Sequence, residues 1–430
     1  MKRKLYEELL KWKQNKDRKP LIISGARQIG KTWLLRHFGK HEYSHVAYIN
    51  CDNEPLAQSL FSDYDIDRIL RVIEAITRVP VLPDETLIIL DEVQEQPKGL
   101  ASLKYFCENA REYHVAVAGS LLGITLHENT SFPVGKVDLL SMYPMTFEEF
   151  LWAMDEELLA DLLVKKDWSV VSGLHVRYVE LLRQYYYVGG MPEAVFTYIN
   201  KKGLEAVRKI QQDILTAYRL DVSKHAPLRE VQRIDMVFRS IPSQLAKENK
   251  KFIYGAVRKG GRATEFEIAI QWLLDAGIVY KVSRVNTPSA PLTFYEDFNA
   301  FKLFLLDCGL FGAMNETEAR DILVGDSVFV EYKGAFTELY VLQQLVTLPN
   351  TPIFYYSAEN SQLEVDFLLQ SKGKAIPLEV KAEENLRAKS LKIVVDKYSF
   401  PKGVRTSMRE YREQEWVVNV PLYAVREYFE

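Results

Sequence analysis

The nine-residue stretch SGARQIGKT, at residues 24–32, constrains the fold more than any other part of the chain. It fits the pattern GxxxxGKT, with glycines at 25 and 30 followed by Lys31 and Thr32. An apolar run at 20–25 predicts a strand before it, and GKTWLLRHF predicts a helix that begins within it. A strand, a glycine-rich turn and a helix are the context in which this pattern binds phosphate.

Each position of this turn has a physical role. Glycines let backbone N–H groups turn toward a phosphate, the Lys31 ammonium can reach the β- and γ-phosphates, and the Thr32 hydroxyl can ligate Mg²⁺. The amino-terminal end of the helix adds partial positive charge. The sequence therefore predicts an ATP site whose cofactor-binding residues are Gly25, Ala26, Arg27, Gln28, Ile29, Gly30, Lys31, Thr32 and Trp33.

An acidic pair ends a second apolar run. LIILDEVQ, at 87–94, predicts a strand buried on both faces that ends in Asp91 and Glu92. We expect Asp91 to hold Mg²⁺ directly or through water and Glu92 to polarise the attacking water, with Lys31 as the second catalytic group. Solvated acids at an ordinary strand end are the alternative, but the upstream phosphate-binding turn favours a site that hydrolyses ATP.

The strand-like run HVAVAGS ends in Ser120. If this run neighbours the strand of Asp91, Ser120 can sense the γ-phosphate, and a helix N-cap is an equally good interpretation. Through this whole region strands alternate with helices. That alternation predicts parallel βαβ units and an α/β fold with a parallel sheet.

Beyond residue 145 the pattern changes. Residues 146–225 are helical in pattern, with a turn at YYYVGGMPEAV, and residues 228–285 predict short helices followed by a hairpin. The helix, Gly277 and strand of residues 263–285 form a winged-helix pattern. The predicted domains are an ATPase core at 1–145, a helical lid at 146–225, a winged-helix region with linker at 226–325, and a C-terminal α/β domain at 326–430.

Composition limits the classes of function. The formal net charge of −3 gives no global attraction to nucleic acid or anionic lipid, so any nucleic-acid contact needs a local basic patch. Three cysteines without a CxxC pair exclude a disulfide framework and a cysteine-rich zinc site. The basic N-terminus lacks the apolar stretch of a signal peptide, and no uncharged run approaches the ~20 residues that cross a bilayer. We expect a cytoplasmic protein without a membrane partner.

Together these motifs resemble a bacterial and archaeal family of AAA+ ATPases whose C-terminal half is a domain of unknown function. The resemblance covers essentially the whole chain and is most specific at YPMTFEEFL and GGMPEAV; FKLFLLDCGLF is another of the stretches that carry it. It implies an AAA+ core, a helical lid, a winged-helix region, a nuclease-like C-terminal domain and a site that a neighbouring subunit of a homo-oligomer commonly completes. Relatives usually carry an arginine, a candidate arginine finger, where this chain has Lys136, which lacks the guanidinium fork.

The last segment contains a second candidate site. Glu338 lies in a predicted helix, Asp366 in the strand-like EVDFLL, and Glu379 and Lys381 lie two apart in PLEVKA, so they point to one face. The pattern D…ExK resembles the PD-(D/E)xK nuclease superfamily, whose restriction-endonuclease-like fold begins with a helix that often contributes a glutamate. In that chemistry the three carboxylates bind one or two Mg²⁺ or Mn²⁺ ions, and Lys381 stabilises the developing charge. The pattern is short, so a domain that binds without cleaving stays open.

A basic segment with interleaved Phe252 and Tyr254 precedes this domain. Cationic side chains beside a winged helix indicate contact with DNA or RNA phosphates, although many winged helices only pack on an ATPase core and leave such charges solvated. Its cationic residues are Lys247, Lys250, Lys251, Arg258, Lys259 and Arg262.

The leading interpretation is an ATPase whose nucleotide state moves the lid and winged helix relative to a nuclease-like domain that acts on nucleic acid. The alternative is a signalling switch in which that domain binds but does not cleave. The consecutive Asp91–Glu92 pair and the large C-terminal half argue against a third class, the P-loop kinases.

Overall fold

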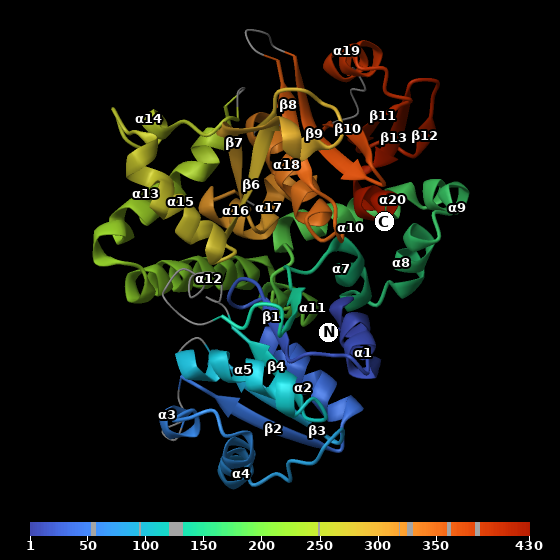
Figure 1. Ribbon diagram of the computed structural model, residues 1–430. Coiled ribbons are helices and arrows are strands. Elements are labelled where there is room, and N and C mark those ends of the chain that lie inside the picture. Colours follow the sequence, from blue (N-terminus) through green and yellow to red (C-terminus); the bar gives the residue numbers. More distant parts are fainter. Residues whose placement is uncertain are drawn as a thin grey trace. The chain divides into compact units, whose positions relative to one another are not determined.

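The computed structural model describes residues 1–52, 57–93, 96–119, 132–247, 250–317, 319–324, 330–358, 363–382 and 388–430. The chain divides into two compact units (Figure 1). The first unit is Met1–Tyr143 with Asp275–Ile278, and the second unit is Pro144–Leu274 with Val279–Glu430. Of the helices in the described ranges, none has both the length and the apolar character that a bilayer-crossing helix needs.

A parallel sheet forms the centre of the first unit. Its strand order is β2-β3-β4-β1-β5, and each neighbouring pair is parallel. β3 and β4 are buried along their whole length, as their unbroken apolar sequences predict. This confirms the predicted parallel α/β core. The strands are β1 (Leu21–Ser24), β2 (His45–Asn50), β3 (Thr86–Asp91), β4 (His114–Ala118) and β5 (Asp138–Ser141).

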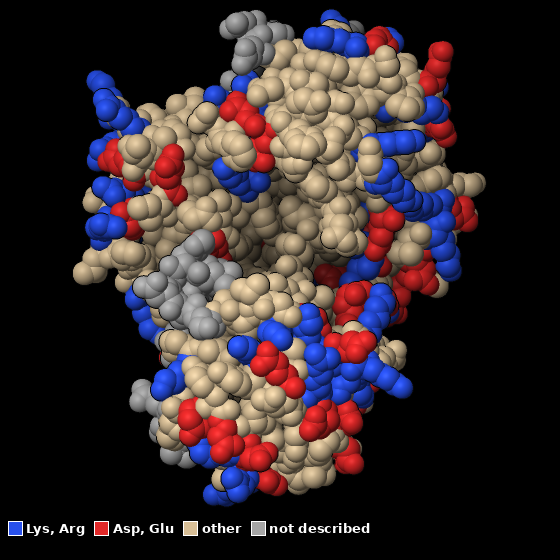
Figure 2. Space-filling view, in the orientation of Figure 1, with Lys and Arg blue, Asp and Glu red and all other residues tan. Residues whose placement is uncertain are grey.

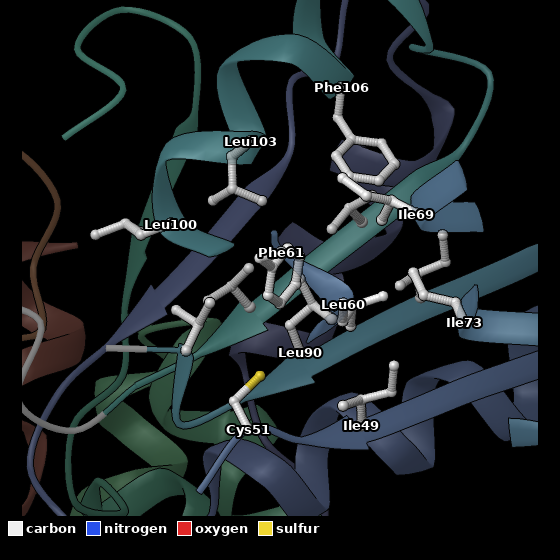
Figure 3. Close-up of a cluster of buried hydrophobic side chains, with 14 of the residues drawn as sticks. Ile49, Cys51, Leu60, Phe61, Ile69, Ile73, Leu90, Leu100, Leu103 and Phe106 are labelled. Carbon is white, nitrogen blue, oxygen red and sulfur yellow. The ribbon is translucent and has the colours of Figure 1, made fainter. Parts of the chain in front are cut away.

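Helices connect these strands and bury their apolar faces. α4 begins after Asp65, whose side chain accepts a hydrogen bond from the Arg68 N–H, and it ends at Arg78 in a left-handed conformation. Apolar side chains of α4 and α5 gather against the sheet in one core cluster, which Figure 3 shows in close-up. The helices of this unit are α1 (Leu5–Gln14), α2 (Lys31–Glu42), α3 (Ala57–Leu60), α4 (Ile66–Thr77) and α5 (Pro97–Asn109).

The second unit begins with a run of helices. The predicted turn is confined to residues 189–191, because Tyr185–Val188 ends one helix and Pro192 begins the next. The short helices predicted after residue 228 are wrong at their start, where a single helix spans Leu228–Leu245. The helices are α7 (Phe147–Ala153), α8 (Glu157–Val164), α9 (Trp168–Gly173), α10 (His175–Val188), α11 (Pro192–Ile199), α12 (Leu204–His225), α13 (Leu228–Leu245), α14 (Tyr254–Val257) and α15 (Ala263–Asp275).

An eight-stranded mixed sheet follows, in the order β12-β13-β11-β10-β9-β8-β6-β7. β6 and β7 form the antiparallel hairpin that the sequence predicts as a wing, but β6 also pairs in parallel with β8. The hairpin is therefore one edge of a larger sheet, and this sheet crosses the predicted boundary between residues 325 and 326. The strands are β6 (Val279–Val285), β7 (Glu296–Leu305), β8 (Ile353–Ser357), β9 (Glu364–Ser371), β10 (Lys374–Val380), β11 (Gly403–Ser407), β12 (Arg412–Glu413) and β13 (Val417–Pro421).

Further helices accompany this sheet. α19 begins at Lys389 and ends at Lys397, close to the helix predicted around 387–395. The remaining ones are α16 (Cys308–Met314), α17 (Ala319–Val324), α18 (Val330–Leu345) and α20 (Val425–Phe429).

Three of the sequence motifs that carry the resemblance meet in the core of the second unit: YPMTFEEFL, GGMPEAV and FKLFLLDCGLF. The buried Asp307 carboxylate accepts hydrogen bonds from the Gly190 N–H at 2.6 Å, the Leu310 N–H at 2.9 Å and the Gln343 amide at 2.9 Å. A Cβ on Gly190 would lie 2.2 Å from the Met145 carbonyl oxygen, so only glycine fits there. These motifs therefore build a junction between helices and sheet.

Candidate nucleotide site and carboxylate cluster

The loop between β1 and α2 has the geometry that the phosphate-binding pattern predicts. Gly25 has φ of +140°, and a Cβ there would lie 2.3 Å from the Met142 carbonyl oxygen. Gly30 has φ of +93° and is the N-cap of α2, whose first residue is Lys31. α2 thus begins directly after the loop. The first N–H groups of a helix have no partner within the helix, so this end of α2 favours an anion.

Arg3 supports this loop, and the sequence reasoning missed it. Its buried guanidinium donates hydrogen bonds to the carbonyl oxygens of Ile29, at 2.9 Å, and Tyr143, at 2.6 Å. In the sequence Arg3 belongs to the basic run MKRK, which looks like a solvated terminus. Nothing in the local sequence distinguishes Arg3 from the other basic residues of this run.

Lys31 is buried within the loop. Its ammonium donates to the carbonyl oxygens of Gly25, at 2.8 Å, and Ala26, at 2.7 Å. Burial lowers the pKa of Lys31 to about 8, and the nearby carboxylates of Glu92 and Asp91 oppose this shift. The side chain is therefore poised between charged and neutral forms near physiological pH.

The structure brings Thr32 and Asp91 together. The Thr32 hydroxyl donates to both carboxylate oxygens of Asp91, at 3.1 and 2.9 Å. A hydroxyl and a carboxylate are oxygen ligands of the kind that Mg²⁺ prefers, so these two residues fit a magnesium ion beside the loop. Burial raises the pKa of Asp91, although hydrogen bonds to its ionised form oppose the shift.

Tyr48 is a further residue of this site that the sequence reasoning missed. Its hydroxyl donates to the Asp91 carboxylate at 2.9 Å, and the Arg36 guanidinium lies 4.8 Å from its ring centroid. Tyr48 lies on β2, the strand next to β3. The sequence did offer a signal for Tyr48, because it is a polar residue near the carboxyl end of the strand next to β3.

Glu92 directly follows β3 with a left-handed backbone, φ of +52°, and its N–H donates to the Ala118 carbonyl at 2.9 Å. Its carboxylate is close enough to Lys31 to be the strongest influence opposing the effect of burial on that lysine. Four predicted residues therefore converge beside the loop: Lys31, Thr32, Asp91 and Glu92.

Two other predicted residues are not brought to this site. Ser120 lies outside the described residues. Lys136 precedes β5 and so lies toward the amino-terminal edge of the sheet, because Asp138 pairs with Leu21 at the start of β1. The loop follows the carboxyl end of β1, at the opposite edge. In its own chain Lys136 forms an ion pair with Glu108 at 2.8 Å, and this contact raises the pKa of Lys136.

The second candidate site lies where α18, β9 and β10 meet. Glu338 is on α18, Asp366 on β9 and Glu379 on β10, and Lys381 follows β10 directly. The Asp366 carboxylate accepts a hydrogen bond from the Val380 N–H at 2.8 Å, and the Lys381 ammonium donates to Glu379 at 2.6 Å. The structure therefore gathers the four predicted residues around the paired strands.

Two lysines that the prediction did not include enter this cluster. Lys302, on β7, donates to Glu364 at 2.5 Å and lies 3.8 Å from the second carboxylate oxygen of Glu338. Lys250, from the segment between α13 and α14, donates to the first carboxylate oxygen of Glu338. We call the set Glu338, Glu364, Asp366, Glu379, Lys250, Lys302 and Lys381 the carboxylate–lysine cluster.

The charges of this cluster perturb one another strongly. Burial opposes ionisation of Glu338, but the ammonium groups of Lys250 and Lys302 outweigh it, so the pKa of Glu338 is lowered. Burial and the carboxylates of Glu338 and Glu379 raise the pKa of Asp366 well above its usual range. Burial also raises the pKa of Glu379, and Lys381 opposes that shift.

This arrangement does not fit the metal that the nuclease resemblance implies. Across the described residues, no group of three or more His, Cys, Asp and Glu side chains is placed to hold a metal ion. Ammonium groups contact Glu338, Glu364 and Glu379 instead. The nuclease interpretation therefore loses the support of its proposed ligands, although the positions of the residues on helix and strands agree with it.

The basic segment is partly neutralised by its own unit. Lys250 turns inward to Glu338, and Arg258 forms an ion pair with Glu265. Phe252 is buried and stacks on Phe301, with ring centroids 5.4 Å apart, so it is no exposed stacking platform. Figure 2 shows basic and acidic side chains interspersed over the face of each unit in view.

Comparisons with known proteins give distant structural likenesses. The Walker-type ATPase PABY2304 of Pyrococcus abyssi is 14% identical, with a TM-score of 0.45 over 72% of this chain and 94% of that chain. The ORC1 protein of Aeropyrum pernix, solved in complex with DNA, is 17% identical, with a TM-score of 0.27 over 73% and 90%. AMPPCP-bound DnaA of Aquifex aeolicus is 17% identical, with a TM-score of 0.29 over 64% and 88%. Overlaps at these TM-scores do not establish a common fold.

A comparison with curated protein sequences gives no match. Family comparisons match three segments of the chain. Residues 179–321 match a domain of unknown function (DUF8612), and residues 333–424 match another (DUF4143). Residues 17–151 match the AAA domain family AAA_14. This match contains the phosphate-binding loop and the Asp91–Glu92 pair, so the first unit carries an AAA-type P-loop ATPase core.

Proposed function

We propose that this protein is a magnesium-dependent ATP hydrolase whose nucleotide state rearranges the second unit, and that the second unit binds nucleic acid without cutting it. The observation that carries the ATPase part is the convergence of Lys31, Thr32, Asp91 and Glu92 beside one loop and one helix end.

The residues of the site divide the work of hydrolysis between them. Lys31 would leave the carbonyl oxygens of Gly25 and Ala26 and donate to the β- and γ-phosphates, whose charge it stabilises as it grows. Thr32 and Asp91 would hold Mg²⁺, which supplies charge neutralisation when bound. Glu92 would orient and polarise the water that attacks the γ-phosphate. Tyr48 would fix the Asp91 carboxylate through its hydrogen bond.

Two substitutions separate binding from hydrolysis. Lys31→Ala should abolish the binding of a fluorescent ATP analogue, and Glu92→Gln should bind ATP but release phosphate at least ~100-fold more slowly, because a general base contributes about that much. Lys40→Ala, an exposed lysine on the same helix, is the matched control and should behave as wild type. If Glu92→Gln hydrolyses ATP at the wild-type rate, Glu92 does not activate the attacking water. If Lys31→Ala still binds ATP, the loop is not the ATP site.

Nucleic-acid binding by the second unit is supported by the helix and hairpin of α15, β6 and β7 and by the cations of the basic segment. The carboxylate–lysine cluster argues against metal-dependent cleavage, since ammonium groups contact the carboxylates that would hold the metal. A fluorescently labelled DNA duplex and a single-stranded DNA should bind with an affinity that falls steeply as salt rises, because phosphate contacts release counterions.

Lys251→Glu combined with Lys259→Glu should weaken that binding, while Lys397→Glu on α19, outside the basic segment, should not. If the affinity for DNA is the same at all salt concentrations and in both variants, the nucleic-acid proposal is refuted. The ATPase proposal does not depend on this result. Cleavage of plasmid DNA that Asp366→Ala abolishes would restore the nuclease interpretation.

A further inference from the structure

The most unusual group of the second unit is a buried ammonium. The Lys302 side chain is 1% exposed, yet it reaches two carboxylates and lies 4.7 Å from the ring centroid of Tyr355. An ammonium removed from water is costly unless opposite charges surround it. The carboxylates of Glu338 and Glu364 supply those opposite charges, at 3.8 and 2.5 Å from the ammonium nitrogen.

The Glu338 carboxylate, which faces Lys302, has one oxygen bonded to Lys250 and a second oxygen without a hydrogen bond. The second carboxylate oxygen of Glu338 is buried without a hydrogen bond, 3.8 Å from the Lys302 nitrogen. A buried oxygen in this state is usually satisfied by a hydrogen bond or a cation. The Lys302 ammonium lies near this oxygen, at a distance that gives attraction without a hydrogen bond.

The contacts of the cluster show why this matters. Glu338, Glu364 and Glu379 each contact an ammonium group. A divalent cation would have to compete with these ammonium groups for the same carboxylate oxygens. Without Lys302, Glu364 loses this ion pair and Glu338 loses one of its two ammonium neighbours, which leaves carboxylate oxygens for a divalent cation.

We propose that Lys302 is the resident cation of this cluster and that it excludes a divalent metal from the place where a metal-dependent nuclease would hold one. A neutral side chain at position 302 then converts the cluster into a site for Mg²⁺ or Mn²⁺. This inference concerns metal binding alone, so it holds whether or not the second unit binds nucleic acid and whether or not the first unit hydrolyses ATP.

Mn²⁺ alone is the probe, because its paramagnetic resonance signal reports free and bound ion directly. The full-length chain, without nucleotide, is titrated as wild type, Lys302→Met, and Lys302→Met with Asp366→Asn. Lys281→Met, which removes an exposed lysine from the adjacent strand β6, is the matched control. Methionine is an unbranched apolar side chain of similar size that lacks the ammonium group with its charge and hydrogen-bond donors.

We expect wild type and Lys281→Met to bind the same small amount of Mn²⁺. Lys302→Met should bind about one additional ion per chain, with oxygen ligands. Asp366→Asn should remove that additional ion. A folded Lys302→Met protein that binds no more Mn²⁺ than wild type overturns the proposal. If Lys302→Met does not fold, the test uses Asp366→Asn and Glu379→Gln in the chain that keeps Lys302. Mn²⁺ uptake by wild type that either of these variants abolishes refutes the proposal. Uptake that both variants retain supports the proposal.

Discussion

ATP affinity should fall as pH rises through 8, because Lys31 must carry its proton to hold the phosphates. In the nucleotide-free chain burial lowers the pKa of this lysine to about 8. Bound phosphates favour the ammonium and raise that pKa, so the complex holds the proton more tightly than the free protein. By linkage, binding is strongest below pH 8 and weakens as the pH rises above it.

The magnitude follows from the same pKa. If the bound pKa lies above 9, the dissociation constant should increase about tenfold between pH 7 and pH 9, which corresponds to about 1.4 kcal/mol. ATP adds little change of its own over most of this range, since phosphate groups complete their second ionisation near pH 6.

Titration of a fluorescent ATP analogue with Mg²⁺, at half-unit steps from pH 7 to 9, measures this slope. Lys31→Arg is the matched variant, because its guanidinium stays charged throughout, and its affinity should be lower but flat with pH. Circular dichroism at each pH checks that the protein remains folded. A constant affinity for wild type, or an equal slope for Lys31→Arg, would refute the reasoning.

Three other predictions follow from single contacts. Gly190→Ala should lower the free energy of unfolding by about 2–3 kcal/mol in urea, because its new Cβ meets a backbone carbonyl, whereas Gly255→Ala, where nothing lies within 4 Å, should not destabilise the chain. Arg3→Met should weaken binding of the fluorescent ATP analogue about tenfold while the exposed Lys16→Met does not, since Arg3 donates to the loop carbonyl; equal affinities would show that the loop needs no such support. Asp65→Ala should lower the free energy of unfolding by about 1 kcal/mol, and hydrogen exchange should show weaker amide protection in the first turn of α4. Unchanged protection would show that the Asp65 side chain does not stabilise the start of this helix.

Much of the first unit could be predicted from sequence because its functional residues act locally. The glycines of the loop meet a backbone requirement that their neighbours in the chain define, and Asp91 ends a strand whose apolar run is unbroken. The parallel order of the strands then brings the loop and the acidic pair to one edge of the sheet. Among the described residues, Arg3 and Tyr48 reach the site from other segments, and the motif did not predict them.

The carboxylate–lysine cluster shows where such reasoning stops. The D…ExK pattern located Asp366 on β9, Glu379 on the adjacent β10 and Lys381 directly after β10. Lys250 and Lys302 reach Glu338 from 88 and 36 residues away, and nothing in their local sequence marks them as buried partners. Their arrival changes the chemistry of the cluster, since they contact the oxygens that a metal would need.

The pairing of β6 with β8 also has a practical consequence for anyone who wants to study the C-terminal residues in isolation. A fragment cut at residue 326 would lose both hairpin strands and leave the backbone edge of β8, with the apolar residues of IFYYS, open to other molecules. Bare edges of this kind recruit further strands, so the excised piece should aggregate. The smallest soluble fragment of this sheet should instead begin before Val279.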